Sequence, residues 1–545
     1  VFRLDVYQGF TNPGPYQFAL TTARSMPFRV RGMQVRVMNG GAPVSGALVY
    51  RLPAGETGDF QPYQDLAGNA YTTDVLGYLR GRGTLEIGDQ LVALYPYATT
   101  DSYGLYYTSA APTTNGINPD TVTTPGPQIL TVSSGNPLLL FNLDVSLEWD
   151  ARTDSDYLIR LEADIERASE FLYDWTNGQV AMGRVTIYHA REHWNDADVQ
   201  IYASNHMRPN ASQGGITTAA LPDPQGVITY YPGQVHMGAT WNRYGEQGSL
   251  AEDWPRTLAH ELGHYALYLD DNYLGRQDGS FTSLDPAACP SAMSDPYRQA
   301  SPFDELHPDG DWLPGCAPTL SNQATGRSDW DTLTHFYPAL AAYQPASGVI
   351  DGPADLVVDV TQVSFVEPTA PPTALADPTF YLTLNGASYR PGDRAHAYLF
   401  SGDWVTDLGR PSLDTVIARG VSAGDEVCLI EADQSLVGCT TVTPPLQELA
   451  LFTAENWQPQ VLLTPASTSI TVSVSNLPPG LSLSTRLYPV GAAAGPAVDL
   501  SWNGSVYQAS IPTTQAAVAG TVRVWVNEAA PQRVTVANFS LGGNP

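Results

Sequence analysis

The sequence predicts a multidomain protein in which a central α/β domain is flanked by all-β sandwich domains. Its 545 residues are too many for a single hydrophobic core. Apolar residues make up 43% and charged residues 15% of the chain, which is typical of folded globular domains. Apolar residues repeat with the period of strands toward both ends of the chain and with the period of a helix in the middle.

These patterns divide the chain into five segments. Residues 1–110 are expected to form a β-sandwich, and residues 111–136, which are rich in Thr, Pro and Gly, a linker or extended loop. Residues 137–345 are expected to form the central domain. Two more β-sandwiches are expected over 350–445, where DLVVDVTQVSFV supplies a strand, and over 446–545, which is immunoglobulin-like or fibronectin-like.

The first segment contains short apolar runs separated by glycine-rich turns. They read GAPVSGALV (41–49), TTDVLGY (72–78) and GDQLVAL (88–94). Their order resembles the carboxypeptidase-regulatory-like β-sandwich that is appended to many secreted proteases. That resemblance implies a structural module without chemistry of its own.

The central segment has the element order of an α/β domain. A strand is expected over 137–149 and short strands over 183–190, 198–204 and 234–241. A helix is expected over 156–175, where apolar residues recur at helical spacing: Leu158, Leu161, Ile165, Ala168, Leu172 and Trp175. The segment PRTLAHELGHYALYLDDNY (255–273) follows and predicts a second helix, which Asp253 can cap.

The second helix carries HELGH, with two histidines four residues apart. Residues at this spacing lie on one helix face, so His260 and His264 can bind one metal ion. Glu261 lies about 100° further round the helix, where it can reach a metal-bound water and accept its proton. The sequence therefore predicts a catalytic zinc site, for which a third protein ligand is needed.

Spacing alone leaves the third ligand open. Asp270 lies six residues after His264, where the pattern HExxHxxGxxH has its last histidine, although Leu267 replaces the glycine of that pattern. A glutamate on a later helix is the other arrangement used by zinc sites of this kind. The nearby candidate, Glu305, lies in a loop rich in Pro and Asp and fits poorly.

The stretch HELGHYALYLDDNY (260–273) resembles a family signature, HExxHxxxGxxDEY. This signature belongs to the protease domain of calcium-activated chloride channel regulators and their bacterial relatives, which are metzincin-like zinc proteases. The resemblance implies a metzincin-like fold for the central domain, Zn²⁺ as the cofactor and a protein or peptide as the substrate. It also implies site residues: His260, His264 and Asp271 as metal ligands, Glu261 as the base and Tyr273 as the tyrosine of the motif.

Two residues depart from the family signature. Tyr268 stands where the family has glycine, and Asn272 stands where it has an acid. Without glycine the helix has to end in another way, and we expect Asp270 or Asn272 to take the left-handed conformation. Asp270 remains the alternative to Asp271 as the third ligand.

The segment CPSAMSDPY (289–297) adds two candidate residues. Metzincin sites rest on a methionine in a tight turn beneath the metal, and the resemblance implies that role for Met293, which could also be an ordinary core residue. Tyr297 could donate a hydrogen bond in the transition state, although its spacing from Met293 differs from that in metzincins.

The four cysteines form two local pairs, Cys289 with Cys316 and Cys428 with Cys439. Each pair closes a short loop within one expected domain, and neither has the CxxC spacing of a metal site. The pattern predicts two disulfides and an oxidising compartment, hence a secreted or cell-surface protein. Four buried free thiols in a cytosolic protein are the alternative.

Charge and composition limit the partners. A net charge of −29 disfavours nucleic acid and anionic membrane surfaces. No run of about 18 apolar residues is present, so no transmembrane segment is expected. An acidic cluster could bind Ca²⁺, but a solvated loop is favoured for its members, Asp304, Glu305, Asp309 and Asp311.

Taken together, these features predict a secreted or cell-surface zinc-dependent endopeptidase. The alternative is a structural or adhesive extracellular surface protein that retains an inactive protease-like domain. The β-sandwich domains could bind a surface or allow the chain to self-associate under either hypothesis.

Overall fold

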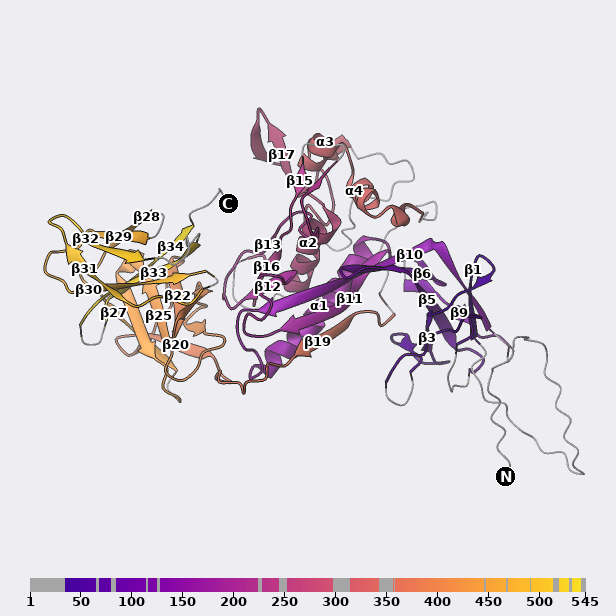
Figure 1. Ribbon diagram of the computed structural model, residues 1–545, viewed down its shortest axis with the longest axis horizontal. Helices are drawn as coiled ribbons and strands as arrows, with labels where there is room; N and C mark the ends of the chain where they lie inside the picture. The colour runs from indigo at the N-terminus through magenta and orange to yellow at the C-terminus, as the bar shows by residue number, and fades with distance from the viewer. Residues whose placement is uncertain are drawn as a thin grey trace, which may run out of the picture.

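The computed structural model describes most of the chain. It covers residues 35–64, 68–79, 85–113, 116–124, 128–223, 228–244, 252–297, 314–342, 356, 358–445, 447–466, 469–490, 492–512, 519–528 and 532–540. Over these residues the protein is mainly β-sheet, arranged in several sheets, as the expected β-rich multidomain architecture requires. Figure 1 shows the N-terminal and C-terminal strands at opposite ends, with α1, α2 and β10 to β12 between them.

The largest sheet has 13 strands and joins the N-terminal and central parts of the chain. Its main path runs β13-β16-β12-β10-β6-β5-β3-β4, and the other members pair at its sides. The strands are β1 (Val35–Asn39), β2 (Ala42–Pro43), β3 (Leu48–Leu52), β4 (Gln61–Pro62), β5 (Gln90–Thr99), β6 (Tyr103–Thr108), β9 (Asp120–Thr121), β10 (Gln128–Leu147), β11 (Val180–Tyr188), β12 (Val199–Tyr202), β13 (Asn210–Ala211), β16 (Val235–Gly238) and β19 (Gln362–Val366).

Strand β10 is the structural link between the two parts. Its start pairs in parallel with β1, its middle pairs antiparallel with β6 as far as Phe141, and from Leu139 onward it pairs in parallel with β11 and then β12. The segment expected as a linker, 111–136, instead contains β7 (Ala111–Thr113), β8 (Gly116–Asn118), β9 and the start of β10. The composition of this segment is typical of turns, yet its last residues form the start of β10. There Ile129 is exposed, whereas Leu130 and Val132 are buried on the other face. A shared strand, rather than a free linker, connects the N-terminal module to the central one.

Strand β19 also differs from the expectation. The sequence placed it in the sandwich over 350–445, but it pairs in parallel with β11, from Arg184↔Gln362 to Tyr188↔Val366. Just before it, the Thr361 hydroxyl hydrogen-bonds to Ser169 of α1 (2.8 Å) and to the Met182 carbonyl (2.9 Å). The chain thus adds an edge strand to the central sheet before it enters the next module.

Two long helices pack against each other and against the central sheet. They are α1 (Ser155–Trp175), close to the bounds that its apolar spacing predicts, and α2 (Asp253–Leu267). Asp154 caps α1, and Leu161, Ile165, Ala168, Leu172 and Trp175 are buried along one face. Shorter helices follow: α3 (Leu320–Thr325), α4 (Asp329–Phe336), η1 (Pro314–Cys316), η2 (Pro338–Ala342) and, further on, η3 (Ala432–Gln434). Two hairpins near α2 consist of β14 (Leu221–Pro222) with β15 (Thr229–Tyr230) and of β17 (Leu274–Gln277) with β18 (Ser280–Ser283).

Two further sheets form the C-terminal part. An eight-stranded sheet contains β20 (Thr379–Leu384), β21 (Ala387–Ser388), β22 (Ala395–Ser401), β23 (Trp404–Gly409), β24 (Thr415–Ile417), β25 (Glu426–Glu431), β26 (Leu436–Thr441) and β27 (Glu448–Thr453). A seven-stranded sheet contains β28 (Gln460–Pro465), β29 (Ser469–Ser475), β30 (Leu483–Pro489), β31 (Val498–Trp502), β32 (Tyr507–Pro512), β33 (Ala519–Val526) and β34 (Val534–Ser540).

The eight-stranded sheet docks directly on the central module. The Asn205 side chain donates to the Leu408 carbonyl at 2.7 Å and to the Ile417 carbonyl at 3.0 Å. The guanidinium of Arg419 pairs with Asp154 at the start of α1. These contacts fix the loop that follows β12, which contains Asn205.

Both cysteine pairs are disulfide-bonded, as their spacing predicts. Cys428 and Cys439 face each other across β25 and β26, and Cys289–Cys316 closes a loop near α2. Among the described residues, no helix combines the length and the apolar character that crossing a bilayer demands.

Candidate metal centre

Helix α2 begins differently from the expectation. Asp253 is the first helical residue rather than the cap, and its carboxylate pairs with the Arg243 guanidinium at 2.8 Å. The preceding residue, Glu252, makes no capping hydrogen bond through its side chain. Two interactions of the Asp253 carboxylate take the place of a capping hydrogen bond. It pairs with Arg243, and as an anion in the first turn it interacts favourably with the helix dipole.

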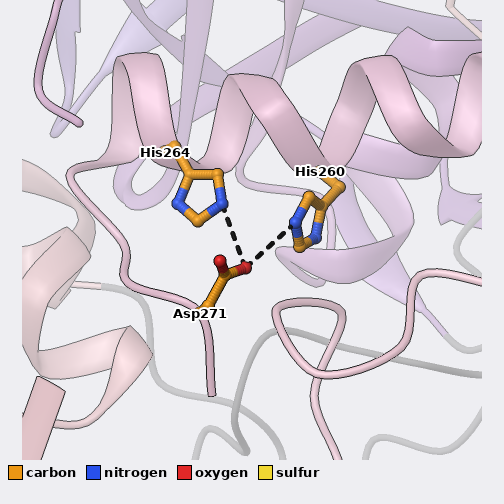
Figure 2. Close-up of side chains that lie close together, drawn as sticks. All are labelled: His260, His264 and Asp271. Atoms are coloured by element: carbon orange, nitrogen blue, oxygen red, sulfur yellow. Dashed lines mark ion pairs between the residues drawn. The ribbon is translucent and has the colours of Figure 1, made fainter. Parts of the chain in front are cut away.

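Three side chains converge beside α2. His260 and His264 project from successive turns toward Asp271, which lies in the loop after the helix (Figure 2). The Asp271 Oδ1 atom lies 3.3 Å from His260 Nε2 and 3.2 Å from His264 Nε2. Asp270 is not part of this group, so the structure places Asp271 and not Asp270 opposite the histidines.

The other nitrogen of each imidazole is held by a backbone carbonyl. His260 Nδ1 lies 2.9 Å from the Ala292 carbonyl oxygen, and His264 Nδ1 lies 2.7 Å from that of Leu269. A carbonyl only accepts, so each Nδ1 carries the proton and donates. Each Nε2 therefore faces the Asp271 carboxylate and, once deprotonated, has a lone pair for a metal ion bound between them, as in histidines that bind metals.

The group attracts added positive charge. Burial opposes a charge on His264, but the Asp271 carboxylate outweighs burial and raises the pKa of His264 to about 9. Burial alone would raise the pKa of Asp271, yet the two histidines hold it well below its usual range. The Oδ1 atom of Asp271 is buried and accepts no well-aligned hydrogen bond from a described residue. Two imidazole nitrogens and a carboxylate oxygen form a donor set that Zn²⁺ takes, so the residues fit a zinc ion.

Glu261 lies directly beside this group. It is only 7% exposed, and burial raises the pKa of its carboxylate against the opposing effect of His260 and His264. Tyr273 follows two residues after Asp271, and burial and the Asp271 carboxylate raise the pKa of its hydroxyl. A buried acid and a protonated phenol thus accompany the three ligand atoms.

Tyr268 ends α2 by taking the left-handed conformation itself. Its φ is 64° and its ψ is 19°, and its amide donates to the Gly263 carbonyl. The expectation that Asp270 or Asn272 would take this conformation is therefore wrong, since neither has a positive φ. The Tyr268 ring stacks on Phe336 at a centroid distance of 3.7 Å. That packing compensates for the strain that a glycine would avoid.

Asn272 ties the ligand loop to α4. Its amide donates to both carboxylate oxygens of Asp329, at 3.0 and 2.8 Å, and the Ser291 hydroxyl donates to the same carboxylate at 2.6 Å. An acid at position 272 would face Asp329 with like charge, which explains this departure from the family signature. Sequence reasoning missed Asp329. It lies 57 residues after Asn272, and nothing in the neighbouring sequence marks it as the partner of Asn272.

The turn containing Met293 supports His260. Met293 is fully buried in the main core. Its backbone N–H donates to the Ser291 hydroxyl, and its carbonyl accepts a hydrogen bond from the backbone N–H of Asn272 at 3.1 Å. The residue before it supplies the carbonyl that holds His260. The disulfide between Cys289 and Cys316 closes the loop that contains the turn. The turn thus holds both a histidine and the ligand loop.

Two other candidates have different positions. The Tyr297 hydroxyl hydrogen-bonds to Trp241 Nε1 and Thr257 Oγ1, both at 2.9 Å. Because the Thr257 hydroxyl already donates to the Asp253 carbonyl, the Tyr297 hydroxyl donates its proton to Thr257 Oγ1. It therefore has no second proton to donate to a substrate. The acidic cluster suggested for calcium lies outside the described residues: Asp304, Glu305, Asp309 and Asp311. The described group Glu426, Cys428 and Cys439 offers no thiolate, because its cysteines are disulfide-bonded.

Comparisons with known proteins do not place the chain in a family. No family model matches it, and no curated protein matches it. Among solved structures, an engineered protein aligns at 19% sequence identity, over 18% of this chain and 22% of its own length, with a TM-score of 0.13. The chain thus spans about a fifth of that protein, and a similarity this low carries no information about fold or function.

Proposed function

We propose that the chain is a secreted or cell-surface zinc-dependent endopeptidase with a metzincin-like central domain. One observation carries the proposal: His260 Nε2, His264 Nε2 and Asp271 Oδ1 converge while both Nδ1 atoms are committed to carbonyls. Glu261, which directly follows His260 in the sequence, adds a buried carboxylate. This set of residues matches what hydrolysis by an activated water needs.

The residues divide the chemistry between them. His260, His264 and Asp271 would hold Zn²⁺, which when bound supplies Lewis acidity toward a water and a peptide carbonyl. Glu261 accepts the proton of the attacking water and then delivers it to the amine of the departing product. Its burial limits exchange of that proton with bulk solvent. Ala292 and Leu269 keep the imidazoles oriented through their carbonyls.

The test is a Glu261→Gln variant of the full chain. Elemental analysis should find about one zinc per chain in both proteins, because Glu261 is not a ligand. Cleavage of casein should fall by roughly 10²- to 10⁴-fold, the range expected when a general base is removed. Glu252→Gln is the matched control, since this partly exposed glutamate lies immediately before the same helix and pairs with Arg167 and Arg256.

The alternative, a structural or adhesive surface protein, predicts a different result. Full zinc occupancy in the wild-type protein, with no cleavage of casein or of any member of a peptide library, would refute the endopeptidase. Oligomers or filaments that survive a chelator would then favour the structural role, with the metal group retained for folding.

A further inference from the structure

A buried carboxylate lies at the start of α4. Asp329 is the first residue of that helix and is fully buried. Both of its oxygens accept from the side-chain amide of Asn272, at 3.0 and 2.8 Å, and Oδ2 also accepts a hydrogen bond from the Ser291 hydroxyl at 2.6 Å. One carboxylate therefore binds two separate loops, and the proposed hydrolytic step does not use it.

Each of these loops leads directly to the metal centre. Asn272 follows Asp271, the proposed third ligand. Ser291 precedes Ala292, whose carbonyl holds His260 Nδ1 at 2.9 Å. The carboxylate thus contacts the immediate neighbour of a ligand in one loop and the immediate neighbour of a ligand's hydrogen-bond partner in the other.

The two loops are also bonded to each other. The backbone N–H of Asn272 donates to the Met293 carbonyl at 3.1 Å, and the backbone N–H of Met293 donates to the Ser291 hydroxyl at 3.0 Å. That hydroxyl in turn donates its own proton to Asp329. These residues form a closed ring of hydrogen bonds, and Asp329 is its charged member.

The second histidine is held differently. His264 Nδ1 donates to the Leu269 carbonyl at 2.7 Å, and the end of α2 packs on the last turn of α4 through the ring of Tyr268 on Phe336. The first turn of α4 therefore contacts the two loops, whereas its last turn supports the end of α2, which carries His264.

The charge of this residue needs a reason beyond tying two loops together. Burying a carboxylate opposes folding unless hydrogen bonds compensate, and neutral side chains avoid most of that cost. Hydrogen bonds to a charged acceptor are shorter and roughly twice as strong as neutral ones, so they restrict the positions of both loops more narrowly. A metal site needs such narrow placement, because ligands that are held loosely bind the ion weakly.

We propose that Asp329 is a positioning residue of the metal centre, which holds two of the three ligands where one ion can bind both. Through Asn272 it fixes the place of Asp271. Through Ser291 it fixes the carbonyl that orients His260. This inference rests on the metal-binding part of the proposed function and does not depend on cleavage of a peptide.

The first measurement is the zinc affinity of the full chain, by competition with a chelator. Asp329→Ala should raise the Kd for zinc by roughly 10- to 100-fold, the effect of losing a group that orients metal ligands. Asp329→Asn keeps the size of the side chain but loses the charge and one acceptor oxygen, so it should raise the Kd by a smaller factor. Asp331→Ala is the matched control, because Asp331 lies in the same turn and accepts from the backbone N–H of Ser328 within the helix cap. It should change the Kd by less than about twofold.

The second measurement separates positioning from a general loss of stability. With Co²⁺ in place of zinc, proton NMR gives one strongly shifted Nδ1–H signal for each bound histidine, here His260 and His264. In Asp329→Ala saturated with Co²⁺, one of these signals should move or broaden and the other should stay, because His260 is the histidine oriented through the Ser291 loop. In Asp331→Ala both signals should match those of the wild type.

The positioning role is refuted if Asp329→Ala binds zinc as tightly as the wild type, or if Asp331→Ala weakens binding as much. A lower affinity in which both signals stay, or both move together, also refutes it. If Asp329→Ala does not fold, Asp329→Asn decides by the same criteria. A wild-type chain that binds neither zinc nor Co²⁺ overturns both the positioning role and the proposed function. Zinc binding that responds to Asp329 as described, without cleavage of any peptide, supports the positioning role and overturns the endopeptidase alone.

Discussion

The Tyr268→Gly substitution sets two opposing effects against each other at the end of α2. Glycine relieves the cost of a positive φ, which is roughly 1 kcal/mol for a residue with a side chain. It also removes a ring that is 7% exposed and stacked on Phe336 at 3.7 Å. Truncating a buried aromatic ring costs roughly 3–5 kcal/mol. The difference predicts a net destabilisation of about 2–4 kcal/mol.

Hydrogen exchange of peptides from α2 measures this effect locally. A global unfolding curve is ambiguous for a multidomain chain, whereas exchange reports the opening of one region. A loss of about 2–4 kcal/mol predicts exchange that is faster by about 30-fold to several hundred-fold. Zinc should still bind, because the Leu269 carbonyl that holds His264 belongs to the backbone.

Tyr268→Ala is the matched control. It loses the same ring but keeps a side chain at positive φ, so it should be less stable than Tyr268→Gly by roughly 1 kcal/mol. If Tyr268→Gly exchanges no faster than the wild type, ring packing does not offset the backbone strain and the reasoning is refuted. Equal exchange in the two variants would show that the left-handed conformation is lost when the ring is removed.

Two further predictions concern charge. Asn272→Asp should place two like charges together at Asp329 and destabilise the loop by about 2–4 kcal/mol. Zinc binding, measured by competition with a chelator, should weaken by roughly 10- to 100-fold. Adding Asp329→Asn to this variant should restore most of the zinc affinity. Burial raises the pKa of Asp164 on α1 to about 6, with Arg160 opposing. The folded state therefore holds this proton more tightly than the unfolded state, and stability falls as pH rises from about 4 to about 6. Asp164→Asn should be more stable than the wild type by about 1.5 kcal/mol at pH 7, after a discount for partial exposure, and by nothing near pH 4, as measured by hydrogen exchange of peptides from α1. A gain that is independent of pH would contradict this account.

Much of the site follows from local pattern. The spacing of His260 and His264 places both on one helix face, and Glu261 follows from the same motif. The apolar period of residues 156–175 predicts α1, and the sequence separation of the cysteines predicts both disulfides. These features depend on residues a few positions apart, or on loops short enough to close, so the chain encodes them directly.

Other parts depend on contacts between distant segments. Composition marks 111–136 as a linker, but its last residues become β10 because β1 and β6 supply partners for their backbone groups. In the same way, β19 joins the central sheet because β11 offers an open edge. Strand pairing of this kind leaves only a weak local signal, since each partner lies far away in the sequence.

Tyr268, at the end of α2, shows the same division most clearly. The sequence alone determines the two histidines, the glutamate and a short list of possible third ligands. Only the tertiary structure decides that Tyr268 ends the helix and that Asp271 faces the histidines. The physical reason is that local preference disfavours the left-handed conformation of a tyrosine. Phe336, 68 residues further on, provides a ring that packs on Tyr268 and outweighs this backbone strain.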